Sequence, residues 1–320
     1  FSFDDPGVMM LSRYERYPHQ YDDEIDTFKV DFMQDVDWGP VSSIEAGVRI
    51  SDRKFIADRG TFLYGSRSGQ GTGWCEDNTS SIACAPQSID GFVKTQSLPG
   101  VPDHFAITNI NGLGDAIFGA GNDEGIKLHS RDWTFIESND IAEETEALYL
   151  MANFEFDMGS VPVTGNFGVR YIKSDVKTIG LQNVGAGNGT PITDGVGVTQ
   201  DNLDHVSYGP EYSDTLPSLN LSFELTDNDI LRVAAAKVMG RPPVGQMKGG
   251  AGSWFGGALN APGDPNFGLT EYNVWTNGTP YLDPFRATQI DISYEHYFDD
   301  GGAVTAAVFW KDIESLVDGP

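Results

Sequence analysis

The stretch Ala147–Val176, ALYLMANFEFDMGSVPVTGNFGVRYIKSDV, decides the fold of this chain. Apolar and polar residues alternate along each half of it, and the two halves meet at Gly159-Ser160. Successive side chains of a strand point to opposite faces, so this alternation predicts two strands, each with one apolar and one polar face. A turn this short joins antiparallel neighbours, and the stretch therefore predicts a β-hairpin.

The same pattern occurs four times along the chain. The predicted hairpins lie at about residues 24–53, 145–175, 214–239 and 285–312. Each has a short turn rich in Gly, Asn or Asp, while long, polar, Gly-rich stretches separate one hairpin from the next. Alternating segments of about ten residues with short turns on one side and long loops on the other are typical of a transmembrane β-barrel. We expect an all-β, antiparallel barrel wall.

A soluble antiparallel sheet whose apolar face packs on a second sheet is the alternative. Two features favour the membrane barrel over it. A sandwich has no reason to place all its short turns on one side, and aromatic residues stand beside the turns, as at a membrane interface. These are Trp38, Phe156 and Phe298. In the barrel, Phe28, Phe154, Leu221 and Ile292 face lipid; in the soluble sheet they are buried together.

The edges of such a wall must be paired. An unpaired backbone group in lipid costs several kcal/mol, so two bare edges would cost on the order of tens of kcal/mol. Eight strands are enough to close a small barrel on themselves. The sequence therefore leaves two alternatives, a small self-closed barrel and a larger wall completed by other strands.

Composition excludes other classes of protein. The chain has 20 basic and 47 acidic residues and a net charge of -27, which argues against a nucleic-acid partner because phosphates require clustered Lys and Arg. It contains no apolar run of the length that a transmembrane helix needs. The chain opens at Phe1 without a leader-like segment and ends in SLVDGP, so we expect it to be part of a longer, processed protein.

The hairpin sequences resemble the barrel domain of TonB-dependent outer-membrane receptors, in the subgroup common in Caulobacter- and Xanthomonas-like bacteria. The matching blocks are Asp23–Arg49, Ala147–Val176, Ser213–Pro243 and Phe285–Ser315. The resemblance implies that residues 1–320 are a partial barrel domain, eight strands of a wall of twenty-two, with short periplasmic turns and long extracellular loops. The family's plug domain, its TonB box and its aromatic-ended final strand have no counterpart in this sequence.

The resemblance also implies a function. It indicates a receptor in the outer membrane of a Gram-negative bacterium that takes up a scarce ligand, an oligosaccharide or a siderophore-like compound. The implied partners are the TonB–ExbB–ExbD complex, which acts on the plug, outer-membrane lipid and lipopolysaccharide, and the small-molecule ligand. Two other hypotheses remain: a passive pore or small self-closed barrel, and a soluble β-rich binding module.

No catalytic constellation is present in the sequence. The five histidines are scattered without an HExxH pair, and the centre of GSRSG is Arg67 rather than a serine nucleophile. We therefore expect no enzyme, no cofactor and no metal site. Cys75 and Cys84 have no histidine at a metal-ligand spacing, which favours a loop disulfide over a zinc site.

Ligand binding is expected in the long loops, where barrels carry it. Residues 54–143 contain Trp74 and Trp133, with room for an extra hairpin and for a short helix within 107–120. Residues 240–284 are rich in Gly and aromatic residues. The candidate ligand-binding residues are Trp74, Trp133, Arg241, Trp254, Phe255, Tyr272 and Trp275. Aromatic rings stack on sugars or flat ligands, but the same rings also pack loops together; Arg241 either holds a ligand or ends a strand.

Charged residues on the polar faces are expected to form ion-pair ladders across the strands. The set comprises Arg49, Arg170, Arg232 and Lys237 with Asp31, Glu45, Glu155, Glu224 and Asp291. The acidic balance of the chain disfavours a highly anionic ferric chelate relative to a neutral oligosaccharide or a cation-bearing ligand.

Overall fold

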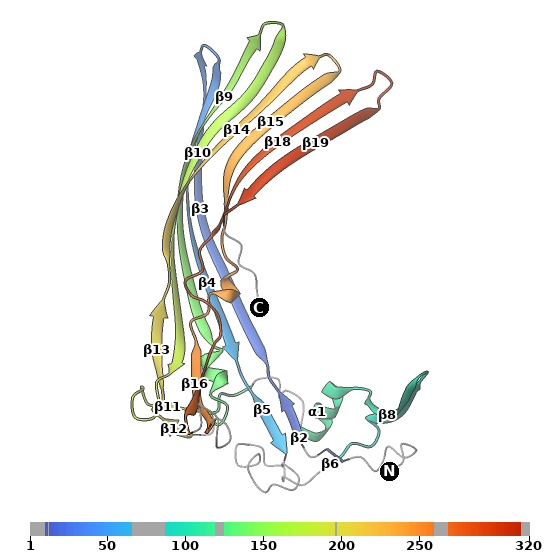
Figure 1. Cartoon of the computed structure of the whole chain (residues 1–320), viewed down its shortest axis with the longest axis vertical. Helices are drawn as coiled ribbons and strands as arrows, with labels where there is room; N and C mark the ends of the chain where they lie inside the picture. Colours follow the sequence, from blue (N-terminus) through green and yellow to red (C-terminus); the bar gives the residue numbers. More distant parts are fainter. Residues whose placement is uncertain are drawn as a thin grey trace.

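The computed structural model describes residues 10–11, 13–65, 87–118, 125–195, 197–258 and 268–314. Its centre is one large antiparallel sheet in which eight long strands follow the order β19-β18-β15-β14-β10-β9-β4-β3 (Figure 1). These strands are β3 (His19–Trp38), β4 (Val41–Arg59), β9 (Asn139–Met158), β10 (Val161–Asn183), β14 (Glu211–Thr226), β15 (Asp229–Gly240), β18 (Phe285–Tyr297) and β19 (Ala303–Ile313). Each long strand pairs with the long strands that precede and follow it along the chain, which is the meander of a barrel wall.

Shorter elements gather at the end of the sheet away from the short turns (Figure 1). The strands are β1 (Met10–Leu11), β2 (Arg13–Arg16), β5 (Phe62–Gly65), β6 (Gln87–Ser88), β7 (Val93–Leu98), β8 (Val101–Ile107), β11 (Ile192–Thr193), β12 (Thr199–Gln200), β13 (Leu203–Tyr208), β16 (Ala251–Ala258) and β17 (Thr270–Thr276). The helices are α1 (Ile110–Phe118), α2 (Trp133–Ile136) and the 3-10 turn η2 (Val244–Gln246). The short helix expected within 107–120 is therefore confirmed as α1. The extra hairpin is β7–β8, which lies outside the large sheet.

Short turns join the long strands in pairs at the opposite end. Gly39, Gly159 and Gly301 have φ values of 65°, 69° and 93° in three of these turns, a conformation that other residues adopt only at a cost. These glycines allow the chain to reverse its direction within a few residues at each of these turns. All the long connections consequently lie at the other end of the sheet.

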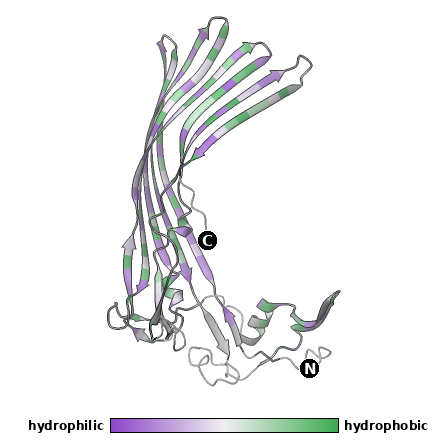
Figure 2. Cartoon of the chain, viewed as in Figure 1, coloured by the Kyte–Doolittle hydropathy of each residue, from purple (hydrophilic) through white to green (hydrophobic). Residues whose placement is uncertain are grey.

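The outer face of the wall near the short turns is apolar and open. Phe28 is 63% exposed and Ile292 45%, and neither belongs to a buried cluster. Figure 2 shows hydrophobic and hydrophilic residues alternating along these parts of the strands. The aromatic residues beside the turns are also exposed: Trp38, Phe156 and Phe298. Among the residues that the structure describes, no second sheet packs on this apolar face, so the structure contradicts the soluble sandwich.

The apolar band ends at one level across neighbouring strands. Val48 pairs with Leu148, while the next outward position on β9, Glu146, pairs with Ile50. The step after that pairs Asp52 with Glu144. On the other side of β9, Glu146 pairs with Lys173 of β10. The change from apolar to charged side chains at this level marks the outer surface of the membrane, where the lipid-facing band ends and water begins.

Polar side chains line the inner face at membrane depth. The hydroxyl of Tyr149 donates to Asp31 at 2.8 Å, and Arg170 lies over the Tyr149 ring at 5.8 Å. Further along, Arg232 pairs with Glu295 at 3.0 Å. Of the expected ion-pair ladder, Arg232 forms an ion pair with a carboxylate outside the predicted set, while Asp31 and Arg170 contact Tyr149 instead of each other. Lys237 was wrongly assigned to it, because Ala236 pairs with the inward Ser218 and the period of two turns Lys237 to the outer face.

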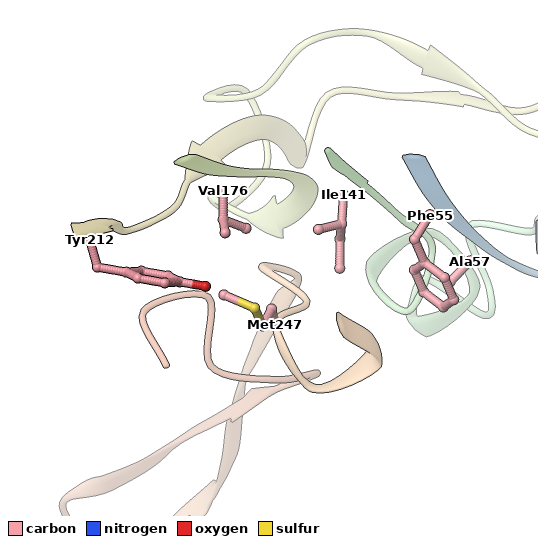
Figure 3. Close-up of a cluster of buried hydrophobic side chains, with 6 residues drawn as sticks. All are labelled: Phe55, Ala57, Ile141, Val176, Tyr212 and Met247. Atoms are coloured by element: carbon pink, nitrogen blue, oxygen red, sulfur yellow. The ribbon is translucent and has the colours of Figure 1, made fainter. Parts of the chain in front are cut away.

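Beyond the membrane band the polarity of the inner face reverses. Four long strands, β3, β4, β9 and β10, continue past the level of Ile50 and Glu146, further than the predicted hairpins. Their inward side chains now form a buried apolar cluster, shown in Figure 3. Its members are Phe55, Ala57, Ile141, Val176, Tyr212 and Met247. Outward residues there face water and are charged, such as Asp140 and Glu144.

The sheet is open. Within the described residues, β3 and β19 are its two edges and do not pair with each other, so the wall is a partial barrel rather than a small self-closed one. None of the described helices has the length and apolar character needed to cross a membrane.

Candidate ligand-binding site

A segment between β15 and β16 folds back over the inner face of the extracellular wall. We call residues 241–250, RPPVGQMKGG, the strap. Its Met247 side chain enters the apolar cluster of Figure 3, between Val176 and Tyr212. The hydroxyl of Thr178 on β10 donates to the Met247 carbonyl at 2.8 Å. The strap therefore caps the wall from inside, at the level where the lumen opens to the exterior.

Asn139 at the start of β9 holds the end of the strap. Its side-chain oxygen accepts hydrogen bonds from the backbone N–H groups of Gly249 at 2.9 Å and Gly250 at 3.1 Å. Its amide donates to the Ile136 carbonyl at 3.2 Å. A Cβ at Gly250 would collide with that same carbonyl, so only glycine permits this close approach. Asn139 thus joins the strap, α2 and β9 at one point.

Arg241 begins the strap and is tied to the wall. Its Nη1 lies 3.0 Å from the Glu143 carboxylate and 3.2 Å from the Thr145 hydroxyl. Glu143 is only 7% exposed, whereas the Arg241 side chain is 39% exposed. The structure therefore gives Arg241 a partner in the wall and leaves part of its side chain exposed.

We expect removal of the Arg241 guanidinium to loosen the strap, because Glu143 would then be a buried carboxylate without its cation. The variants are Arg241→Met, Glu143→Gln and their combination. A double-mutant cycle on the free energy of unfolding should give a coupling energy of about 1 kcal/mol, since the pair is partly screened by solvent. A coupling energy of zero would show that the pair does not hold the strap.

Trp133 lies in a group of rings and charges at the end of β4. The Arg59 guanidinium lies 5.2 Å from the Trp133 ring centroid and 5.8 Å from that of Tyr17. The Tyr17 and Trp133 rings meet edge to face at 5.1 Å. The Glu137 carboxylate forms an ion pair with Arg59 at 3.2 Å, and His19 Nε2 lies 3.6 Å from it. Trp133 therefore stacks against a cation of the protein itself.

Four of the other candidates lie on one hairpin, β16–β17. Phe255 pairs with Tyr272, and Trp254 with Asn273. The Trp275 ring lies over Gly252 and packs against the cluster of Phe135, Ile136 and Leu203, while Tyr272 is 57% exposed. Tyr272 and Trp275 stand an odd number of residues apart, so they face opposite sides of the strand. The hairpin therefore brings the aromatic residues onto neighbouring strands, but Tyr272 and Trp275 do not form one continuous aromatic surface.

Three predicted residues, Trp74, Cys75 and Cys84, lie outside the described residues. Sequence reasoning missed three others that the structure brings to the inner wall: Arg59, Asn139 and Lys248. No motif marks them, because their partners are distant in sequence; Asn139 and Gly249 are one such pair. Across the described ranges there is no group of three or more residues with metal-ligand side chains close enough to hold a metal ion.

An open antiparallel wall with a lipid-facing outer band, a polar inner face and a capped extracellular mouth defines a transmembrane β-barrel protein. The family model described as "TonB dependent receptor-like, beta-barrel" matches residues 10–319. The chain belongs to this family. No curated protein matches the chain. The family is one of non-enzymatic transporters in the outer membrane of Gram-negative bacteria, which implies TonB energy coupling and ligand binding.

Proposed function

We propose that the chain forms part of the barrel of a receptor that binds a scarce solute outside the cell and moves it inward with energy from TonB–ExbB–ExbD. The solute is an oligosaccharide or a siderophore-like compound. The observation that supports this proposal is the wall itself, apolar toward lipid and polar toward a lumen, with the strap folded over its inner face beyond the membrane band. We also propose, from the resemblance of the hairpin sequences, that the receptor belongs to the Caulobacter- and Xanthomonas-type subgroup.

We further propose that the strands that close the wall, and a plug inside it, come from other parts of the receptor. The open edges at β3 and β19 support this, because backbone groups left unpaired in lipid are too costly. The polar ladder at membrane depth, including Asp31, Tyr149 and Arg170, is a surface suited to contact a polar plug.

The loop residues take part in ligand capture in this proposal. Tyr272 presents an exposed side chain on β17, and Arg241 presents a partly exposed side chain at the start of the strap. Trp133, Trp254, Phe255, Trp275 and Trp74 are proposed to line or support the same mouth.

Growth of a strain that lacks the receptor tests the proposal. Across a panel of single oligosaccharides and single iron chelates, we expect the deletion to slow growth on at least one compound when it is scarce. The intact receptor should restore growth only where TonB is present. Restoration without TonB, together with stepwise conductance of the purified receptor in planar bilayers, would instead establish a passive pore.

A further inference from the structure

The strap places one lysine in an unusual setting. Lys248 is only 8% exposed, and its ammonium makes no hydrogen bond or ion pair with any residue in the described part of the chain. Its nearest aromatic neighbour is Tyr21, whose ring centroid is 5.6 Å from Nζ. Buried ammonium groups are normally paired, because an isolated charge is costly to remove from water.

Lys248 faces the lumen rather than the lipid or the outer surface. Tyr21 pairs with Ala57, a member of the inner apolar cluster, so the Tyr21 ring stands on the inner face. That ring is 55% exposed and stacks on Phe55 at 5.8 Å. The ammonium therefore lies beside an open aromatic surface inside the mouth of the wall.

The charged groups around Lys248 include more cations than carboxylates. Arg59 lies at the same inner level, at the end of β4, and the end of α2 brings one carboxylate, Glu137, to this point. Arg59 Nε is buried and makes no hydrogen bond, although it lies 3.2 Å from Glu137 Oε2. His19 adds no fixed charge, since burial and then the nearby Arg59 lower its pKa. Two cations therefore share one carboxylate, in a chain whose net charge is -27.

The surroundings of Lys248 affect the pKa of its ammonium in opposite directions. Burial lowers the pKa of its ammonium, Glu137 raises it and Arg59 lowers it further. An anionic oxygen beside Nζ would oppose the effect of burial and stabilise the charged form.

We propose that Lys248, together with Arg59, forms a subsite for an oxyanion of the transported ligand, a carboxylate or a phosphate, while the exposed Tyr21 ring receives the flat or apolar part next to it. This inference rests on the proposed function, and it reverses the expectation from total charge: the solute is an acidic one, such as a uronate-bearing oligosaccharide or a carboxylate chelate. The acidic outer surface lies on the other side of the wall from this subsite.

Binding of small probes to the purified full receptor tests the subsite without uptake. The probes are galacturonate, its neutral analogue galactose, and inorganic phosphate, titrated by calorimetry. We expect at least one anion to bind saturably and galactose to bind at least about tenfold more weakly, the size expected for a hydrogen bond to a charged group. Galacturonate alone would indicate a carboxylate ligand, and phosphate alone a phosphate-bearing one.

Lys248→Met should weaken anion binding by about tenfold or more, and Lys248→Arg should retain most of it. The matched control is Lys54→Met, which removes the same charge from the exposed outer side of the same wall and should change binding less than about twofold. If Lys248→Met does not assemble, competition between galacturonate and phosphate on the unaltered receptor decides whether they share one position.

The proposal is overturned if neither anion binds, if Lys248→Met leaves anion binding unchanged, or if galactose binds as tightly as the anion that binds best. None of these results bears on energised uptake. A receptor that restores TonB-dependent growth but binds no anion would retain the proposed function and lose only this subsite.

Discussion

An arginine at position 152 should prevent much of the receptor from assembling in the outer membrane. Ala152 is the middle of five outward apolar positions on β9, between Leu148 and Phe156, and therefore lies near the centre of the bilayer. Arginine on the lipid face at this depth costs about 2–4 kcal/mol. Because alanine is small, little packing is lost with it and the cost comes mainly from the buried charge. The free energy of unfolding of the receptor in phospholipid vesicles, measured with urea or guanidinium, gives the value.

The adjacent residue supplies the control. Met151 faces inward and pairs with Glu45 of β4, so Met151→Arg places a cation opposite a carboxylate on the wet side of the same strand. We expect Met151→Arg to change the unfolding free energy by less than about 1 kcal/mol. Equal losses for the two variants would contradict the assignment of faces, and a larger loss at position 151 would reverse it.

The membrane half of this wall could be predicted from the sequence, because one physical rule governs it. Lipid on one side and a wet lumen on the other force a period of two, as between Leu148 and Phe156. The predicted strands β14–β15 and β18–β19 accordingly end within a few residues of the observed bounds. The rule also holds for Lys237, which faces outward; the prediction had assigned it to the inner face.

The extracellular half could not be predicted in the same way. Past Ile50 the wall leaves the lipid, so its outer face becomes charged and its inner face becomes apolar, as at Phe55 and Ala57. The alternation continues with the opposite phase, and a reading based on lipid exposure ends the strand at that change. The predicted limits of 24–53 therefore stop short of the observed strands β3 and β4, which reach His19 and Arg59.

The candidate site was less predictable still. Aromatic residues in Gly-rich loops pointed to β16–β17, but Trp275 packs on Gly252 and only the three-dimensional register shows it. The contacts that build the inner mouth join residues far apart in the chain, such as Asn139 with Gly250 and Lys248 with Tyr21. No local pattern encodes such pairs.

Asn139 holds the end of the strap, and Asn139→Leu should release that end. Leucine has a similar volume but cannot accept the hydrogen bonds of Gly249 and Gly250, which would leave two buried N–H groups without partners. At about 1–3 kcal/mol for each group, the local cost is roughly 2–6 kcal/mol. The backbone there should open instead, and hydrogen exchange at these two amides should quicken by at least about tenfold.

Asn139→Asp is the matched control for loss of the accepting oxygen. The aspartate keeps an oxygen for both N–H groups, and its second oxygen takes the place of the amide that faces the Ile136 carbonyl, so the strap should stay in place when that carboxyl is protonated and can donate. Exchange at Gly249 and Gly250 should then remain within a few-fold of the unaltered receptor, while Asn139→Leu departs from it. Because the strap carries both Arg241 and Lys248, its release should also abolish the anion binding proposed for the mouth, with the lipid-embedded wall still folded. Slow exchange in the leucine variant would mean that Met247 and the apolar cluster, rather than Asn139, hold the strap against the wall.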